Sequence, residues 1–401
     1  MTRHSSLSHK VDVAIIGAGP AGLSTALHLL QLEPGWSERL IVLEKDAHPR
    51  KKLCGGGITC FGLNRLRALG LPLGVPFVPV RSANLRYRNL NLKIKGDPVF
   101  VVTRRSDFDS WLAQCARARG VNLVENSKVT RLEMCDDGIQ IYTPDLTCLA
   151  KVVVGADGSR GFVRSWLGAR EQPAHVARVL ETIKLASGNE KPFTGQEANF
   201  NFDHLDSDLQ GYFWVFPSIR NNQPILNTGV YDARVAGGGP KADLTKILEE
   251  ELNEIEIDIH STRVEGHPIH WFSPQNRFSG HRVILAGDAA GTDPLFGEGI
   301  SVSLAYGAVA AKNLERAFRE NDFKFHKYKT SILTSDVGRY LLLRWFIASL
   351  VFRIQRSDIL VRGIWGLGRL LAPFIYPSSP LMDVSSFHFA PAQQMKELMI
   401  D

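Results

Sequence analysis

Hydrophobic side chains along this chain fall into continuous runs that predict strands and spaced patterns that predict helices. Residues 11–16 are a short apolar run rich in β-branched side chains, as in a strand that is buried on both faces. A helical spacing of apolar residues follows at 23–32, and a second apolar run covers 39–44. Together these segments predict a strand–helix–strand unit at the start of the chain.

A different pattern dominates the middle of the chain. Residues 84–103 and 176–270 show the short alternation of apolar and polar side chains that is typical of antiparallel strands, with one charged helical stretch at 242–254. The remaining predicted elements are helices at 107–119 and 300–318 and buried strands at 151–154 and 282–286. Because α/β elements lie on both sides of the β-rich region, we expect one interrupted domain rather than two successive domains.

The turn between the first strand and the first helix has the glycine spacing G-x-G-x-x-G. Gly17 permits a tight turn, Gly19 lets a pyrophosphate approach the backbone, and Gly22 allows helix and strand to pack closely. Glu44 ends the second strand about 20 residues further on, where an acid accepts a hydrogen bond from a ribose hydroxyl. The predicted dinucleotide contacts are Gly17, Gly19, Pro20, Ala21, Gly22, Glu44 and Lys45.

Composition and charge narrow the setting. The chain has 401 residues, of which 44% are hydrophobic and 22% charged, as in an ordinary globular protein. Its five cysteines are scattered without close ligand pairs, so we predict no metal site and no disulfide framework. The net charge of +6 favours anionic surfaces, and the first ten residues lack the apolar stretch of a secretory signal. We therefore expect a cytoplasmic protein that works at the periphery of a membrane.

Two later turns each carry an aspartate from a strand into a glycine turn. Asp157 and Gly158 follow the strand at 151–154, and Gly287 and Asp288 follow the strand at 282–286. Each carboxylate is suited to hydrogen-bond a sugar or ribityl hydroxyl, although either turn alone would be read as an ordinary Asx turn.

In this order, the three turns resemble the motifs of the FAD-dependent hydroxylase and reductase superfamily, which implies that the cofactor is FAD. The resemblance places Arg105 near the phosphate and ribityl part of FAD, while a solvated surface arginine is the alternative. It also places Gly297, Gly299 and Ile300, at the start of the long helix, beside the pyrimidine edge of the flavin. There the helix dipole would favour the negative charge of a reduced flavin.

Within this superfamily, two segments resemble the geranylgeranyl reductase group. Residues 52–57 match the pattern K-x-C-G-G-G, and the segment 211–217 contains Y-x-W-x-F-P at residues 212–217. The group also has a proline three residues before the tyrosine, where this chain has Leu209. The resemblance covers roughly residues 10–320 and implies an isoprenoid site. Its predicted substrate contacts are Tyr212, Trp214, Phe216 and Pro217, and Lys52 is assigned to the cofactor. The alternation of three rings on one strand face is also compatible with ordinary core packing.

The same resemblance places Cys54, Gly55 and Gly56 close to the isoalloxazine, and we name these three as catalytic. Reduction of an isolated C=C bond requires a hydride on one carbon and a proton on the other. We hypothesise that Cys54, or a water that it positions, assists the proton transfer or the alignment of the substrate. The alternative is a small thiol chosen for packing.

The predicted fold class is α/β, with a Rossmann-type FAD-binding domain interrupted by a β-rich substrate domain and followed by a helical C-terminal segment. The predicted ranges are 1–82, 101–175 and 271–330 for the FAD-binding domain, 83–100 and 176–270 for the substrate domain, and 331–401 for the C-terminal segment.

Two strongly apolar stretches, 340–352 and 359–376, are interrupted by arginines and glycines, and neither holds the roughly 18 uncharged residues of a spanning helix. Arginines such as Arg344 lie between Trp345, Phe346, Trp365 and Phe374, a pattern that suits a helix in a membrane interface or a helix that caps a lipid entry. A helical pair that closes the core is the alternative.

These observations favour an FAD-dependent oxidoreductase that reduces C=C bonds of a geranylgeranyl or other isoprenoid or lipid chain. The single dinucleotide motif implies that NADPH would bind only transiently as electron donor, and reduced ferredoxin is an equal candidate. One rival is a flavin monooxygenase or halogenase-like enzyme acting on an apolar or peptidyl substrate. The other is a membrane-associated flavoprotein that passes electrons to quinone. We expect no nucleic-acid partner, because that role leaves the flavin turns unexplained.

Overall fold

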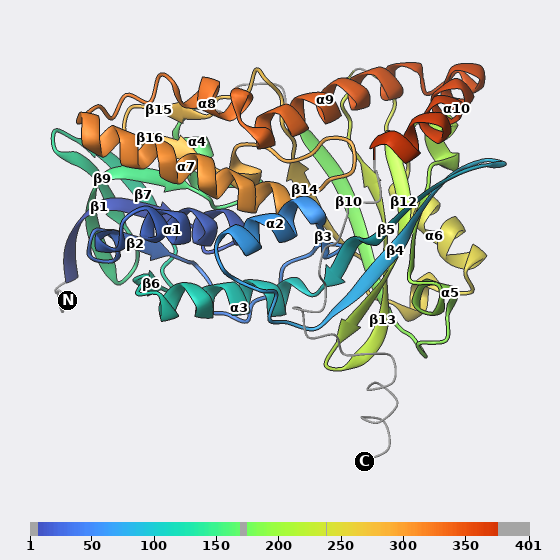
Figure 1. Cartoon of the computed structure of the whole chain (residues 1–401), viewed down its shortest axis with the longest axis horizontal. Helices are drawn as coiled ribbons and strands as arrows, with labels where there is room; N and C mark the ends of the chain where they lie inside the picture. Colours follow the sequence, from blue (N-terminus) through green and yellow to red (C-terminus); the bar gives the residue numbers. More distant parts are fainter. Residues whose placement is uncertain (1–6, 169–174, 238, 376–401) are drawn as a thin grey trace, which may run out of the picture.

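Two mixed sheets lie side by side in the computed structural model, with helices packed against both (Figure 1). The structure describes residues 7–168, 175–237 and 239–375. Predictions that concern residues 1–6 and 376–401 lie outside the described residues.

The first sheet is the nucleotide-binding type predicted from the start of the chain. Strand β1 pairs in parallel with β2 on one side and with β9 on the other, and β16 extends the parallel set beyond β9. The sheet has the order β15 (Ser279–Gly280), β16 (Val283–Leu285), β9 (Leu146–Gly155), β1 (Leu7–Ile16), β2 (Leu40–Leu43) and β6 (Leu123–Val124), with β8 (Gly138–Tyr142) and β7 (Arg131–Cys135) joined at β9. All four residues of β2 are buried, which explains its uninterrupted apolar sequence.

Helices α1 (Pro20–Leu32), α3 (Arg105–Ala118) and α7 (Ile300–Glu320) pack beside one another on this sheet (Figure 1). Helix α3 begins two residues earlier than the sequence pattern predicted, which places Arg105 in its first turn. The smaller elements of this half are α2 (Cys60–Ala68), α4 (Phe162–Trp166), η1 (Pro34–Glu38) and η4 (Gly287–Ala289).

The second sheet has eight strands and is mostly antiparallel. Its order is β14 (Glu265–His270), β10 (Val176–Leu185), β13 (Gln223–Asp232), β12 (Gly211–Arg220), β11 (Glu197–Asn201), β4 (Phe77–Tyr87), β5 (Leu90–Thr103) and β3 (Gly57–Thr59). Alternate residues of β12 face two different cores: Tyr212, Trp214 and Phe216 on one side, Phe213 and Val215 on the other.

Helix α6 (Leu244–Glu254) covers the second of these cores, and Asp243 caps its start by accepting from the backbone N–H of Thr245 and Lys246. The other small elements of this half are α5 (Lys191–Thr194), η2 (Asp203–Ser207) and η3 (Ile259–Ser261).

The hairpin of β4 and β5 is longer than the short strands expected for residues 84–103. Strand β4 already begins at Phe77, and a register shift between Val80 and Ser82 breaks its alternation. Because of this irregularity, the sequence pattern did not predict the first half of the strand. Residues 77–82 belong to the second sheet, although the sequence analysis assigned them to the FAD-binding range. The domain ranges themselves stay a proposal.

Three helices follow the long α7: α8 (Tyr328–Thr334), α9 (Asp336–Ile354) and α10 (Asp358–Ile375). They run along the top of the molecule in Figure 1, and α9 and α10 lie above the second sheet. Residues of both helices, such as Phe352 and Trp365, pack into the same core as the aromatic face of β12. None of the described helices is long and apolar enough to cross a membrane.

Candidate functional site

The glycine turn between β1 and α1 forms one wall of a deep cleft at the carboxyl ends of the first sheet. Gly17 has φ +104°, and a Cβ there would lie 2.4 Å from the carbonyl oxygen of Ala156. At Gly19 the nearest atom to such a Cβ is Arg50 Nη2 at 3.6 Å, so this side is open. Helix α1 begins at Pro20 without a side-chain cap from the described residues. Its first N–H groups therefore face the cleft and suit an anion.

Glu44 borders the cleft at the end of β2 and braces the same turn. Its Oε2 accepts from the backbone N–H of Ala18 at 2.8 Å, and its Oε1 accepts from that of Asp46 at 3.2 Å. The Arg50 guanidinium lies 3.6 Å from Oε1. Glu44 thus sits where the sequence places the ribose contact, and the neighbouring Lys45 also lines the cleft.

Arg105 is buried in the wall of the cleft rather than solvated. It donates from Nε and Nη2 to the two carboxylate oxygens of Asp109, each at 2.8 Å, and Arg50 Nη2 lies 3.3 Å from Asp109. Burial alone would lower the pKa of Arg105, but the charge and hydrogen bonds of Asp109 raise it above its usual value. The alternative of a surface arginine is therefore wrong.

The two aspartate turns meet across the cleft. Asp157 accepts from the backbone N–H of Val163 through Oδ2 at 2.9 Å, whereas its buried Oδ1 has no hydrogen-bond partner among the described residues. Burial raises the pKa of Asp157 to about 6. Asp288 lies opposite and accepts from the Ser159 hydroxyl at 3.4 Å. Asp157, Gly158 and Asp288 all line the cleft.

The start of α7 closes the far end of the cleft. Gly299 is its N-cap residue, no side chain caps the helix in the described structure, and Gly297 has φ +66°. Gly297, Gly299 and Ile300 line the cleft together with Lys52, whose pKa is lowered by burial and raised in part by Asp288. The positive end of the helix dipole therefore faces a part of the cleft where negative charge is favoured.

Two of the predicted cofactor residues do not line the cleft. A Cβ on Gly22 would lie 2.0 Å from the carbonyl oxygen of Gly17, and one on Gly287 would lie 2.6 Å from the Cβ of Ala21. These glycines let α1 pack against its neighbours, which is the packing role expected for Gly22.

The residues of the cleft fit an FAD molecule. An uncapped helix start beside Gly19 suits the pyrophosphate, and Glu44 suits the adenosine ribose. The unpartnered Oδ1 of Asp157 is an acceptor that a sugar or ribityl hydroxyl could satisfy. The start of α7 at Gly299 suits the pyrimidine edge of a reduced flavin.

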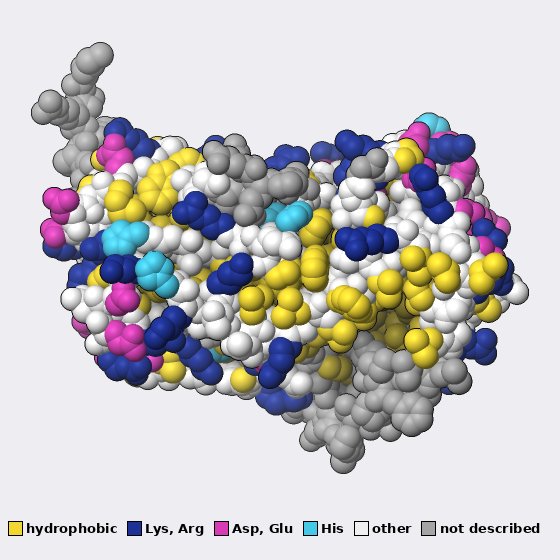
Figure 2. Space-filling view, turned by 90° about the horizontal axis from the view of Figure 1, so that it is seen from above, with side chains coloured by type: hydrophobic (Ala, Val, Ile, Leu, Met, Phe, Trp, Pro, Cys, Tyr) yellow, Lys and Arg dark blue, Asp and Glu magenta, His cyan; other side chains and the backbone are white. Residues whose placement is uncertain are grey.

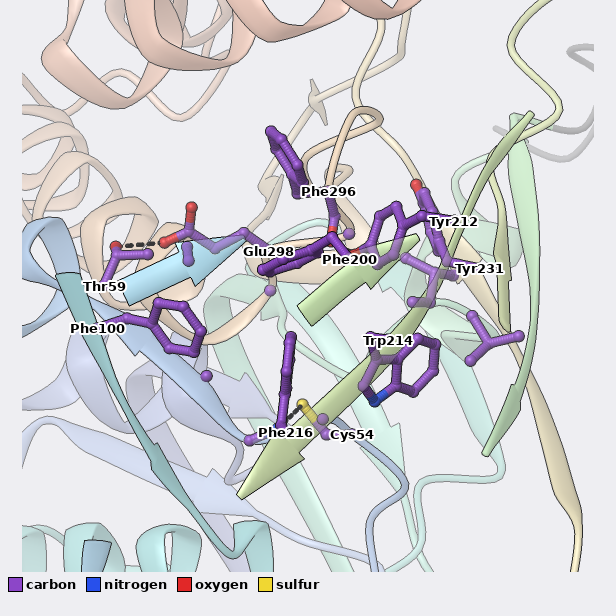
Figure 3. A pocket seen from close by; sticks show the side chains of 18 of the residues that line it. Cys54, Thr59, Phe100, Phe200, Tyr212, Trp214, Phe216, Tyr231, Phe296 and Glu298 are labelled. Carbon is purple, nitrogen blue, oxygen red and sulfur yellow. Dashed lines mark hydrogen bonds between the residues drawn. The ribbon is translucent and has the colours of Figure 1, made fainter. Parts of the chain in front are cut away.

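A second cavity lies against the aromatic face of β12. Figure 3 shows its rings arranged around one space, with Cys54 at one end near Phe216 and Trp214 and with Glu298 at the opposite side bonded to Thr59. The lining rings are Phe100, Phe200, Tyr212, Trp214, Phe216, Tyr231 and Phe296. Of the four predicted substrate contacts, Tyr212, Trp214 and Phe216 line this pocket, and Pro217 does not. Alternation along the strand explains the difference.

The cleft and the aromatic pocket share one wall. Cys54, His267, Ile269, Gly297 and Gly299 line both cavities. Gly55 and Gly56, which were predicted to be catalytic with Cys54, line only the aromatic pocket. A flavin that reaches from the cleft toward this wall would therefore face the pocket at the segment the sequence singled out.

A polar network crosses the aromatic pocket beside Cys54. Trp214 donates from Nε1 to Oδ1 of Asn227 at 2.8 Å, and Asn227 donates from Nδ2 to Oε1 of Glu181 at 3.0 Å and to the Cys54 carbonyl oxygen at 3.3 Å. Glu181 is only 2% exposed and lines the pocket. His267 also lines it, and burial lowers the pKa of His267 to about 4.

Helix α9 contacts the turn at residues 293–299, which precedes α7, through a buried cluster of charged side chains. Arg344 donates from Nη1 to Oδ2 of Asp293 at 2.7 Å, and its Nη2 lies 3.6 Å from Oε2 of Glu298. The hydroxyls of Tyr340 and Thr59 donate to the two oxygens of Glu298. The Arg344 side chain therefore faces the core rather than the outer surface of the helix.

Several functional candidates were missed by sequence reasoning: Arg50, Asp109, Glu181, Asn227, His267, Asp293 and Glu298. Most of them stand in segments without a motif, and their neighbours come from other elements. Glu298 is an exception, because it lies between Gly297 and Gly299 of the predicted turn. No group of three or more metal-ligating side chains occurs within 7–168, 175–237 and 239–375.

Comparisons with known proteins agree with this geometry. Residues 10–321 match the family of the FAD binding domain. A digeranylgeranylglycerophospholipid reductase of Methanococcus vannielii is 24% identical over 337 residues, which cover 79% of this chain and 80% of that protein. A geranylgeranyl bacteriochlorophyll reductase-like protein from Thermoplasma acidophilum has a similar crystal structure, with a TM-score of 0.75 at 18% identity over 95% of this chain and 99% of that one.

The same fold occurs in a p-nitrophenol 4-monooxygenase from Pseudomonas putida, with a TM-score of 0.66 at 19% identity over 98% of each chain. At these identities the structural likenesses establish the fold alone. They confirm the predicted fold class, and the motif resemblance to the reductase group within the FAD-dependent superfamily is confirmed by the family match and the named relatives.

Proposed function

The chain belongs to the FAD binding domain family and is an FAD-dependent oxidoreductase, and from this premise we propose that it reduces C=C bonds of a geranylgeranyl or other isoprenoid lipid chain. The observation that carries the proposal is the aromatic pocket, which meets the nucleotide cleft at Cys54. A pocket of seven rings offers a long apolar chain a large contact area with few competing donors.

Reduced FAD supplies a hydride when it is bound. In this proposal, the start of α1 would bind the pyrophosphate of FAD and Glu44 would bind the ribose. The turn at 297–299 would contact the pyrimidine edge of the flavin. Tyr212, Trp214 and Phe216 would align the apolar chain and keep water from the reacting bond. Cys54 and the glycines after it would form the surface that the two ligands share.

The test is direct. The purified protein is loaded with FAD, reduced with dithionite without oxygen, and given a digeranylgeranyl glycerophospholipid. We expect mass spectrometry to show a gain of two hydrogens for every saturated double bond. If the product instead gains oxygen or halide when air or halide is supplied, the monooxygenase or halogenase rival is correct. If only a quinone is reduced, the electron-transfer rival is correct.

The electron donor is part of the proposal. Because the single dinucleotide motif is assigned to FAD, NADPH would bind only transiently. The net charge of +6 would favour binding of an acidic ferredoxin. Flavin reduction measured with each donor in turn, at low and high salt, distinguishes them. Ferredoxin-driven reduction should slow steeply with salt, because exposed charges are screened.

We also propose that the protein works at a membrane surface through the outer stripe of α9, defined as Leu343, Phe346 and Leu350. These residues lie on one face of the helix and are largely exposed, with Phe346 at 61%. Exposed Arg339 and Arg353 flank the stripe. Figure 2 shows hydrophobic side chains gathered over this part of the molecule. Such a stripe with arginines at its ends suits anionic lipid headgroups.

A further inference from the structure

The reaction proposed above needs an acid as well as a hydride donor. When a trisubstituted alkene is saturated, one carbon takes the hydride and the other takes a proton, while positive charge develops on the more substituted carbon. The aromatic pocket can stabilise that charge, because ring faces attract cations. The proton must come from a group on the same wall.

Most titratable groups that line the pocket are already engaged. Tyr212 donates its hydroxyl to the Phe296 carbonyl oxygen, and burial raises its pKa well above the usual value. Both oxygens of Glu298 accept hydrogen bonds from Thr59 and Tyr340. His267 has a pKa of about 4 because of burial, so it carries no extra proton at neutral pH.

Glu181 differs from these groups in its contacts. Its Oε1 accepts from Asn227 at 3.0 Å, and its buried Oε2 has no hydrogen-bond partner among the described residues. It stands on the pocket face of β10, two residues after Val179, which lines the same cavity. The link through Asn227 to Trp214 fixes the carboxyl next to the ring wall and the Cys54 loop.

The surroundings of Glu181 raise its pKa above the ordinary value of a glutamate. Burial raises its pKa, the hydrogen bonds of Asn227 and of the Cys54 backbone and the charge of Arg104 lower it in part, and the like charge of Glu265 raises it again. Glu265 is its register partner on β14, and His267 is the neighbouring titratable group on that strand. On β13 the facing residues are Gly229 and Asn227, neither of which is charged.

We propose that Glu181 is the catalytic acid that delivers this proton to the alkene. The O–H bond of the carboxyl breaks and a C–H bond forms at the less substituted carbon. The second C–H bond forms with hydride from the reduced flavin, which is oxidised by two electrons as the alkene is reduced. The carboxylate regains its proton from water. This role rests on the proposed function.

The test compares Glu181→Gln with Glu249→Gln, which alters an exposed carboxylate on α6, away from the pocket. Glutamine preserves the shape and the Asn227 contact but cannot donate the proton. We expect E181Q to bind FAD with an unchanged visible spectrum and to lose alkene reduction by roughly 10²- to 10⁴-fold, while E249Q keeps its activity.

A second readout does not depend on turnover. Infrared spectra of the wild-type protein, taken at the pH of maximal activity, should contain the C=O band of a buried protonated carboxyl that is missing in E181Q and present in E249Q. If E181Q fails to fold, Glu181→Asp replaces it: the acid is withdrawn by one methylene, and turnover should fall while the infrared band remains.

The outcomes separate the two proposals. An active wild type with an equally active E181Q, or a wild type without the infrared band, overturns the role of Glu181 alone. A wild type that binds flavin but saturates no alkene overturns the proposed function and this role with it.

Discussion

At the scale of single residues, the indole of Trp214 packs directly against Gly229, a position that leaves no room for a side chain. A Cβ on Gly229 would lie 2.4 Å from Cη2 of the indole and 2.2 Å from the Leu180 carbonyl oxygen. The wall of the aromatic pocket is therefore shaped by the absence of a methyl group on the neighbouring strand β13.

Gly229→Ala should push the indole into the pocket. Because the core is closely packed, we expect a loss of about 1–3 kcal/mol in the free energy of unfolding, together with weaker binding of long apolar chains. Urea denaturation measures the first effect and lipid titration the second. Gly237→Ala is the matched control, since a Cβ there meets no atom within 4 Å. Equal effects of the two substitutions would contradict this account.

His270 should make the stability depend on pH. Burial, aided by Arg164, lowers its pKa to about 3, whereas an unfolded histidine titrates near 6.5. The unfolded chain therefore takes up the proton first, so stability falls as pH drops below 6.5. Between pH 7 and pH 4 this amounts to about 3 kcal/mol.

His270→Gln should flatten that part of the curve, measured as the urea midpoint at a series of pH values. The exposed His260, replaced in the same way, provides the control and should leave the slope unchanged. Parallel curves for wild type and H270Q would show that another group governs the acid side.

Sequence reasoning at this scale found residues whose chemistry is written in a local motif. Gly17 has the positive φ that its motif requires, and Trp214 lines the pocket as its strand pattern indicated. Glu181 could not be found in this way. In an alternating strand it looks like any solvent-facing acid, and only the pairing of β10 with β13 shows that its side chain is buried.

At the scale of elements, α9 serves two surfaces at once. On its inner face Arg344 forms an ion pair with Asp293, while its outer stripe is exposed. The pattern of the sequence predicted the helix but could not separate these faces, because apolar residues occur all round it. Trp365 of α10 shows the same ambiguity: it was assigned to a membrane interface, yet it is 6% exposed and packs beside Tyr87.

The outer stripe leads to a prediction for vesicle binding. Replacing Leu343, Phe346 and Leu350 with serine removes the apolar contact and leaves the flanking arginines. We expect binding to phosphatidylglycerol vesicles in a sedimentation assay to fall by at least 10-fold, while the FAD spectrum stays unchanged. Leu185→Ser, which removes an exposed leucine at the end of β10, is the control. Undiminished binding of the triple variant would exclude the stripe.

At the scale of the whole molecule, the two sheets share the wall around Cys54, so a ligand in the cleft touches both halves. Sequence patterns predicted this arrangement in outline, because nucleotide-type elements recur on both sides of the β-rich region. They could not give the position of the shared wall. His267 and Gly297 reach it from distant parts of the chain, and no local pattern encodes that meeting.

FAD should therefore stabilise the chain as a unit. At a free concentration 100 times Kd, binding adds about 2.7 kcal/mol to the free energy of unfolding. For a chain of this length that corresponds to a rise of roughly 3 °C in Tm. Scanning calorimetry of the protein with FAD, and after FAD removal, measures this rise. A cofactor that stabilised only the first sheet would split the transition into two.

The ion pair between Asp293 and Arg344 also has a consequence for biosynthesis. The two residues are 51 positions apart, and a ribosome adding 5–20 residues per second needs roughly 3 to 10 seconds to travel between them. During that interval the aspartate has been synthesised without its cationic partner. The turn at residues 293–299 cannot reach its final structure until α9 docks against it. A chain truncated before α9 would therefore lack the ion pair that holds this turn.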